Sequence, residues 1–447
     1  MKNRFLKLLA SVIVICIIPA LVYNRYMQWV IRPQMKLIDQ SPNRSHQSQR
    51  KVCGGSLANK GITWVDVDLC LISAYFDYFV KKTRVMGIKN RSRGSNFKCI
   101  FCCSNSTLQH TTAEAVVHSD HFDFPYGHTD ILCSQPTNDC GLAYVSVNDS
   151  SSNVKSLHFL EIKNIQEKHN MEYTFVVCIS PMFDNYDKVI QFIQHVEMYK
   201  ILGAQKIVIY LTNSSSRMEK VLDHYSRSGL LELVQWPIES YFTPSHGWKF
   251  PDHPGDIHYF GQIAALNDCV YRNKYKAQYV VINDLDEIAF PVQHENWAQL
   301  LEYLKVTYPK ANNFMIRSHV FPEYMTDENN TFKMKNWDVV MKGKDLNILE
   351  HIYREPDRSW VFNPMKMIVS PQSIQHTSIH QILISPPDKE TITLDSNIAR
   401  LCHFRKPEQP ELKKSDLIKD TSFWKYNVSL IENVNEVLQK TGISVRQ

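Results

Sequence analysis

The sequence predicts an α/β fold built on a parallel sheet, preceded by a small disulfide-linked β-rich domain and an N-terminal membrane anchor. From residue 171 onward, continuous apolar runs alternate with segments of helical periodicity. Such runs are typical of parallel strands that are covered by helices on both faces. Upstream of this region, seven cysteines crowd between Cys53 and Cys140. This density indicates disulfide bonds in an oxidising compartment.

The composition fits a globular protein of two parts. The chain has 447 residues, of which 44% are hydrophobic and 21% are charged, and its formal net charge is +5. This length exceeds that of one typical domain. The sequence contains no basic stripe with interleaved aromatic residues, so nucleic acid is not an expected partner.

The N-terminus predicts a membrane anchor. Three basic residues precede an uncharged apolar run over residues 8–24, close to the ~20 residues that span a bilayer. We therefore expect a cytosolic tail over residues 1–7, a type II signal anchor over 8–24 and a polar stem over 25–55. A cleaved signal peptide is the alternative, but no cleavage site with small residues follows the apolar run.

Glycosylation acceptors support a lumenal location for the rest of the chain. Asparagines that begin an N-x-S/T triplet are acceptors for N-linked glycans in secreted and lumenal proteins. The predicted acceptors are Asn43, Asn90, Asn105, Asn148, Asn213, Asn329 and Asn427.

The crowded cysteines allow two interpretations. Disulfides are favoured in an oxidising lumen, and the adjacent Cys102 and Cys103 are expected to bond to different partners. The alternative is a zinc site formed by Cys99 and Cys102 with Cys103, His110 or Cys133. A second C-x-x-C pair, which zinc sites often supply, is missing.

The predicted elements follow in order along the chain. Residues 56–170 form the Cys-rich domain, with strands over 70–80 and 143–147. Residues 171–410 form the catalytic domain, and residues 411–447 a tail. The catalytic pattern predicts strands over 175–179, 206–211, 231–236, 279–283, 313–320 and 366–369, and helices over 189–202, 217–228, 260–273 and 296–306. A final helix is expected over 430–440.

The helix over 189–202 shows how these elements are recognised. Its apolar residues recur at spacings of three and four, and Gly203 follows as a C-terminal stop.

The carboxylates after the strand over 279–283 form the candidate functional site. Side chains alternate across a strand, so Asp284 and Asp286 are expected on one face, where the strand ends. Two such carboxylates repel each other without a cation, and oxygen ligands favour Mg²⁺ or Mn²⁺. Ligands of parallel sheets bind beyond the carboxyl ends of the strands. The alternative is a solvated turn or helix cap without a ligand.

Several ordered segments resemble a known family. The segments are TFVVCISPMF at 174–183, HVEMYKILG at 195–203, GQIAALNDCVYR at 261–272, VINDLDEIAFP at 281–291, KMIVSP at 366–371, Ile379 with His380, and HFR at 403–405. SAYFD at 73–77 adds an upstream match. Together they resemble glycosyltransferase family 92, and the likeness covers roughly residues 64–407.

The resemblance implies a fold, a location and an activity. It implies a Rossmann-type nucleotide-sugar transferase domain of the GT-A kind, in a type II protein of the Golgi membrane. Described members move galactose from UDP-galactose to glycans, including fucose on N-glycan cores, with a divalent metal that is usually Mn²⁺. Ser370 departs from the family pattern, where an arginine is expected, and this puts one phosphate contact in doubt.

The resemblance and the spacing together suggest roles for individual residues. Asp286 is expected to bind the metal, and Asp284 the metal or the ribose and uracil side through water. His403 is the expected third metal ligand, with His380 in reserve. Lys366 or Arg405 could hold the diphosphate as a fixed cation. Glu287 could start the next turn or orient a metal-bound water.

Transfer from an α-linked donor to a β-linkage inverts the anomeric carbon and requires a general base. Glu323 is the first candidate, ahead of Asp327, Asp338 and Glu350. Packing is the expected role of His195 and Tyr199, which lie on one face of the helix over 189–202.

Three functions compete at this point. The first is a metal-dependent galactosyltransferase whose acceptor specificity resides in residues 237–259 and 321–364. The second is an inactive, membrane-anchored glycan-binding protein with the same fold. The third is another metal-dependent reaction of nucleotide diphosphates, such as hydrolysis.

Overall fold

The computed structural model describes residues 51–58, 62–66, 68–94, 96–137, 139–149, 157–166, 170–326, 347–358 and 362–443. The residues from Gln49 onward form one compact unit. The predicted anchor over 8–24 and the acceptors Asn43 and Asn329 lie outside the described residues. Within the described part of the chain, no helix is both long and apolar enough to cross a membrane.

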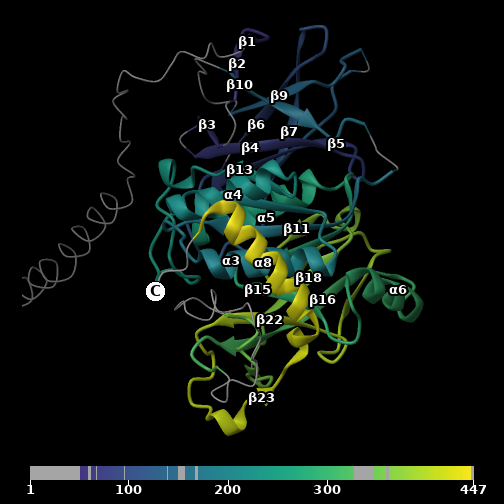
Figure 1. Ribbon diagram of the computed structural model, residues 1–447. Coiled ribbons are helices and arrows are strands. Elements are labelled where there is room, and N and C mark those ends of the chain that lie inside the picture. Colours follow the sequence, from purple (N-terminus) through teal and green to yellow (C-terminus); the bar gives the residue numbers. More distant parts are fainter. Residues whose placement is uncertain are drawn as a thin grey trace, which may run out of the picture. The chain divides into compact units, whose positions relative to one another are not determined.

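The first part of the chain is β-rich. Its described strands are β1 (Lys51–Val52), β2 (Gly55–Leu57), β3 (Thr63–Asp66), β4 (Leu69–Asp77), β5 (Lys82–Asn90), β6 (Phe97–Cys102), β7 (Leu108–Val117), β8 (Tyr126–Cys133), β9 (Tyr144–Asp149) and β10 (His158–Lys163). They form a sheet in the order β1-β2-β10-β9-β6-β7-β8-β5-β4-β3, and β10 also pairs with β4. Figure 1 shows this part in purple and blue.

Disulfides connect these strands, as the cysteine density predicts. The bonds are Cys53–Cys102, Cys99–Cys133 and Cys103–Cys140. The adjacent Cys102 and Cys103 therefore bond to different partners, as expected. The alternative zinc site is wrong, because its four cysteines are all in disulfides and its histidine, His110, is exposed on β7.

The second part carries a mixed sheet. Its strands are β11 (Tyr173–Met182), β12 (Lys206–Leu211), β13 (Leu231–Gln235), β14 (Ala277–Asn283), β15 (Glu287–Pro291), β16 (Ala311–Pro322), β18 (Met365–Val369), β21 (Glu390–Thr393) and β22 (Ala399–Arg405). Short strands outside this sheet are β17 (Tyr353–Arg354), β19 (His376–Thr377), β20 (Ile382–Ile384) and β23 (Ile418–Lys419). The order is β13-β12-β11-β14-β18-β16-β22-β15, and β21 pairs with β16.

The sheet is parallel only in part. The four strands β13, β12, β11 and β14 are parallel, as the alternation of strands and helices predicts. β18 runs antiparallel to β14, and β15 runs antiparallel to β22. The predicted parallel arrangement is therefore confirmed for the first four strands, whereas the other strands are mixed, with β16 parallel to β21 and β22. Strands such as β18 follow irregular chain rather than a crossover helix, and antiparallel pairing needs no such helix.

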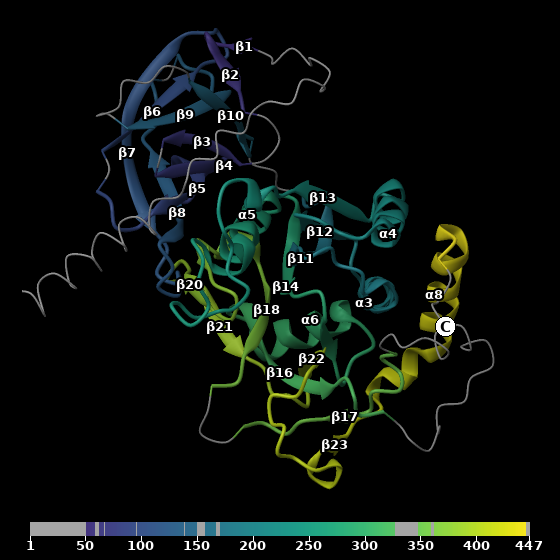
Figure 2. The same ribbon diagram turned by 90° about the vertical axis from the view of Figure 1, so that its left-hand side faces the viewer.

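Helices cover both faces of this sheet. They are α3 (Val189–Leu202), α4 (Ser216–Arg227), α5 (Gln262–Arg272), α6 (Trp297–Thr307) and α8 (Asn427–Thr441). One buried cluster joins the sheet to α3, α4, α6 and α8, and another joins its opposite face to α5. In Figure 2, α8 lies beside α3 and α4, far from α5.

Helix α5 also attaches the β-rich part to the mixed sheet. Its buried Asp268 accepts hydrogen bonds from Ser73 and Tyr75 of β4 and from Tyr210 of β12. Arg272, one turn later, pairs with the same carboxylate at 2.9 Å. The disulfide Cys178–Cys269 joins α5 covalently to β11. The helix that begins beside the candidate site is therefore held from three sides.

Candidate functional site

The candidate site lies in the turn between β14 and β15. Asp284 and Asp286 occupy this turn, and Glu287 is the first residue of β15. The buried Glu287 carboxylate accepts the backbone N–H of Asp284 at 2.8 Å. The hydroxyl of Tyr199, in α3, donates to the Glu287 carbonyl. These bonds fix the backbone that carries both aspartates, so Tyr199 does more than pack.

Asp284 is held by donors from three other elements. The Lys366 ammonium of β18 lies 2.7 Å from its Oδ2 atom. Gln262, at the start of α5, donates to its Oδ1 atom at 3.0 Å. The Ser180 hydroxyl of β11 donates to the same oxygen. Burial opposes ionisation, but the ion pair with Lys366 holds the pKa of Asp284 below its usual value. Both carboxylate oxygens of Asp284 are therefore engaged.

Asp286 pairs with His403 instead. The Nε2 atom of His403 lies 3.3 Å from Oδ1 of Asp286, and its Nδ1 atom lies 3.4 Å from Oε1 of Glu287. The antiparallel pairing of β15 with β22 sets Glu287 opposite His403, which brings the imidazole to the turn. Burial acts against it, but these two carboxylates raise the pKa of His403.

Glu287 is the third carboxylate of the group and also lies close to Lys366. Its Oε2 atom lies 3.5 Å from the Lys366 ammonium, and its side chain is buried. Burial raises the pKa of Glu287 to about 7. Lys366 thus pairs with two of the three carboxylates, Asp284 and Glu287, and a neutral His403 would leave the ionised group with net negative charge. Such a group attracts a cation.

Asp286 and His403 fit a metal ion better than Asp284 does. Two neighbouring ligands of an octahedral ion at about 2.1 Å are about 3.0 Å apart, and their atoms are 3.3 Å apart here. The Asp286 side chain is 30% exposed, so an ion can reach it. Glu287 orients the far nitrogen of the ring, which is how metal-binding histidines are usually supported.

The backbone before α5 is unusual and leads directly to Gln262. Tyr259 and Phe260 have φ values of 33° and 55°, and Gly261 follows with 71°. Non-glycine residues rarely adopt this left-handed region, which costs roughly 1–3 kcal/mol per residue. The Phe260 ring stacks on Phe183, just past β11, with 3.8 Å between centroids. This strained turn presents Gln262 to the Asp284 carboxylate.

Arg405, Glu323 and His380 are the other residues to which the sequence analysis assigns a role. Arg405 ends β22 and is exposed, with its NH1 atom 3.5 Å from Glu408. The Glu323 side chain is exposed, and its backbone N–H donates to the Arg405 carbonyl at 3.0 Å. The Nδ1 atom of His380 lies 3.0 Å from the Met365 carbonyl. Burial lowers the pKa of His380 to about 4.

Other candidates are structural or fall outside the described chain. The Ser370 hydroxyl donates to Gln372 at 2.9 Å. Asp327 and Asp338 lie outside the described residues. Among the predicted glycan acceptors, Asn105 and Asn213 are exposed, whereas Asn90, Asn148 and Asn427 are half-buried.

A cavity of about 420 Å³ lies at the end of β18 that carries Lys366. Two residues that line it are next in sequence to residues near the aspartate turn. Met365 precedes Lys366, and Arg317 precedes Ser318, whose hydroxyl is 3.5 Å from His403 Nδ1. Further lining residues are Asp357, Arg358, Phe362 and Asn363. Asp357 lies 3.7 Å from Arg317 and 3.6 Å from His319.

Ser180 and Gln262 contact Asp284, and Asp357 lines the cavity, but the sequence analysis assigns none of them. Ser180 lies near the end of β11 and Gln262 begins α5, and both fall in segments that carry the family resemblance. Polar residues at the ends of elements were therefore the available signal. Asp357 follows irregular chain and offers no comparable pattern.

The candidate site lies within a region that matches a known protein family. The model of glycosyltransferase family 92 matches residues 173–440, which contain every residue of the aspartate turn and its contacts. Two Caenorhabditis elegans proteins of that family are 22% and 27% identical over 223 and 207 residues. These spans are 50% and 46% of this chain, and 40% and 37% of the relatives. The chain therefore spans about two fifths of the length of these relatives.

A third relative has a more specific name. The beta-1,4-galactosyltransferase galt-1 of Caenorhabditis elegans is 26% identical over 123 residues, which are 27% of this chain and 26% of that protein.

Solved structures are only distantly similar. Glucosyl-3-phosphoglycerate synthase from Mycobacterium tuberculosis, in complex with Mn²⁺, UDP and glucosyl-3-phosphoglycerate, has a TM-score of 0.24 and 12% identity, covering 61% of this chain and 81% of that one. UDP-glucose pyrophosphorylase has a TM-score of 0.22 and 8% identity, covering 60% and 99%. Scores this low carry no argument. The family match extends over more than half of the sequence, and this chain belongs to glycosyltransferase family 92.

Proposed function

We propose that this protein is a metal-dependent, inverting glycosyltransferase of the GT-A kind that moves galactose from UDP-galactose to a glycan. The observation that carries this proposal is the meeting of Asp286 with His403 at the carboxyl end of β14, supported by Glu287 and Lys366. Family membership supports sugar transfer. The name of the relative galt-1 supports galactose, and the N-terminal pattern supports a type II Golgi location.

Asp286 and His403 are the residues that would hold the ion, Mn²⁺ or Mg²⁺. When bound, such an ion offsets the charge of the diphosphate and stabilises UDP as a leaving group. Lys366 and Glu287 fix the turn beneath it. Asp284, held by Ser180 and Gln262, would meet the ribose side of the donor.

Arg405 is the remaining fixed cation of the proposal. Its side chain is 46% exposed, and its NH1 atom lies 3.5 Å from Glu408. Lys366, in contrast, is fully buried against Asp284 and Glu287. Arg405 is therefore better suited than Lys366 to reach a bound diphosphate.

The acceptor is assigned to the cavity beside β16 and β18. Phe362 is 61% exposed there, and an aromatic face packs on the C–H groups of a sugar ring. Asp357 supplies a carboxylate for the acceptor hydroxyl, which an inverting transfer needs as a general base. Glu323 remains the predicted base from the sequence, and Asp357 is the second candidate.

Acceptor-dependent UDP release tests the proposal. The full chain, purified in mild detergent, would be given UDP-galactose, UDP-glucose or UDP-N-acetylglucosamine with released N-glycans, with Mn²⁺ or with EDTA. We expect turnover of UDP-galactose only with Mn²⁺ and acceptor. Glycan binding without turnover of any donor would favour the inactive binding protein, and free galactose without acceptor would favour hydrolysis.

A further inference from the structure

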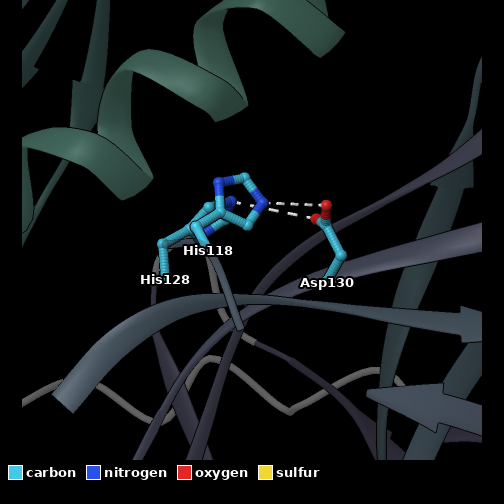
Figure 3. A group of neighbouring side chains, drawn as sticks. All are labelled: His118, His128 and Asp130. Carbon is cyan, nitrogen blue, oxygen red and sulfur yellow. Dashed lines mark hydrogen bonds and ion pairs between the residues drawn. The ribbon is translucent and has the colours of Figure 1, made fainter. Parts of the chain in front are cut away.

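A second group of possible metal ligands lies in the β-rich part, away from the aspartate turn. His118 directly follows β7, and His128 and Asp130 share one face of β8. The backbone N–H of His118 donates to the His128 carbonyl at 2.9 Å, which brings the strands together. Figure 3 shows that both imidazoles face the Asp130 carboxylate. All three side chains are at least nine-tenths buried.

The hydrogen bonds of His128 leave a lone pair aimed at this carboxylate. Its Nδ1 atom lies 3.1 Å from the Gly87 carbonyl. A carbonyl only accepts, so Nδ1 carries the proton and Nε2 of the neutral ring carries a lone pair.

Nothing in the described chain satisfies the two atoms that face each other. Nε2 of His128 lies 3.8 Å from Oδ1 of Asp130, and both atoms are buried without a hydrogen-bond partner. Two buried acceptors in this position need a donor or a cation between them. Two ligands of a tetrahedral zinc ion, each at about 2.0–2.1 Å from it, are about 3.4 Å apart. A small side-chain adjustment closes the difference.

The other oxygen of Asp130 is already held. Arg84 donates to Oδ2, and the Nε2 atoms of His118 and of His376 in β19 lie 3.0 Å and 2.8 Å from it. The Arg84 guanidinium also pairs with Asp77 at 2.9 Å, so its charge is shared between two carboxylates. This arrangement orients Asp130 and leaves Oδ1 for a ligand.

We propose that His118, His128 and Asp130 bind one zinc ion that serves the fold and is separate from the ion of the aspartate turn. One ligand atom from each lies within 4.8 Å of the others. Two imidazoles with one carboxylate favour zinc, whereas manganese and magnesium prefer oxygen ligands. Because His376 contacts Asp130, the ion would tie β7 and β8 to the segment beside α5.

Metal analysis of the full chain tests this proposal. The protein would be purified without chelator and exchanged into metal-free buffer, and zinc would be counted by inductively coupled plasma mass spectrometry. We expect about one zinc per chain. X-ray absorption at the zinc edge should show nitrogen and oxygen ligands with the scattering pattern of two imidazoles. Absence of zinc, or sulfur ligands, would overturn the proposal.

Matched variants locate the ion. His128→Gln and Asp130→Asn should lose the zinc, whereas His110→Gln, an exposed histidine on β7, and Asp286→Asn should keep it. Retention of zinc by a folded His128→Gln protein would contradict the assignment. If the ligand variants do not fold, the X-ray absorption spectrum of the unaltered protein tests the proposal by showing whether two imidazoles bind the zinc. The Asp286→Asn result separates this inference from the proposed sugar transfer.

Discussion

The Nε2 atom of His403 lies 3.3 Å from the Oδ1 atom of Asp286, across the antiparallel pair of β15 and β22. The two residues are far apart in the sequence. Their pairing places an imidazole beside a carboxylate that is 30% exposed and can therefore be reached by a ligand. The neighbouring Asp284 is engaged by Lys366, Ser180 and Gln262. The two aspartates of one motif therefore have different surroundings.

Removing the buried ammonium of Lys366 should destabilise the protein. In Lys366→Met, Asp284 and Glu287 lose their shared partner, and an unpaired buried charge costs several kcal/mol. Because Asp284 is 25% exposed, we expect a loss of about 2 kcal/mol in the free energy of unfolding. Urea denaturation measures it. Lys389→Met, which removes a surface pair with Asp388, should change stability by less than about 0.5 kcal/mol. Equal effects of both substitutions would argue against the buried pair.

Asp357 should act on the acceptor side of the reaction. If its carboxylate takes the proton of the acceptor hydroxyl, Asp357→Asn lowers kcat by about 10²- to 10⁴-fold while the KM for the donor stays constant. Initial-rate kinetics with both substrates varied give these constants. Glu323→Gln, which changes an exposed carboxylate outside the described cavity lining, is the matched comparison. The opposite ranking of the two variants would return the role of base to Glu323.

Acid should weaken the attachment of α5 to the β-rich part. Burial opposes ionisation of Asp268, but Arg272, Lys163 and hydrogen bonds hold its pKa below the usual value. A folded pKa below the unfolded value of about 3.9 stabilises the fold above that pH, and this contribution is lost as pH falls through 3.9 toward the folded pKa. Asp268→Asn should therefore reduce stability at pH 7 by about 3 kcal/mol.

The same variant should also flatten the fall in stability on acidification. Denaturation series between pH 7 and pH 3 test this, with the exposed Asp223→Asn as control. A variant whose pH dependence matches that of the unaltered protein would show that Asp268 does not titrate with folding.

Local pattern was sufficient for most elements of the catalytic part. The strand Lys206–Leu211 has the predicted bounds, and α3 spans Val189–Leu202 because its apolar spacing ends at Gly203, which adopts a φ of 112°. The aspartate turn was also predictable, because it follows a buried strand. These features depend on neighbours in the sequence.

Partners from distant strands could not be predicted in the same way. The register that sets His403 opposite Glu287 depends on an antiparallel pair, and the pattern of alternating strands and helices had suggested only parallel strands. A single serine or glutamine does not indicate a functional site in a sequence. The roles of Ser180 and Gln262 therefore follow only from their contacts with Asp284 in the structure. His118, His128 and Asp130 meet through strand pairing and share no recognised spacing.

Manganese dependence of UDP release in the unaltered chain, Asp286→Asn and His403→Gln tests the central claim most directly. The account predicts saturable activation by Mn²⁺ in the unaltered protein, a loss of at least about 100-fold in kcat/KM for Asp286→Asn, and a raised Mn²⁺ requirement for His403→Gln. Asp223→Asn, an exposed aspartate of α4, should behave as the unaltered protein. Full, metal-independent turnover by a folded Asp286→Asn protein would contradict the account.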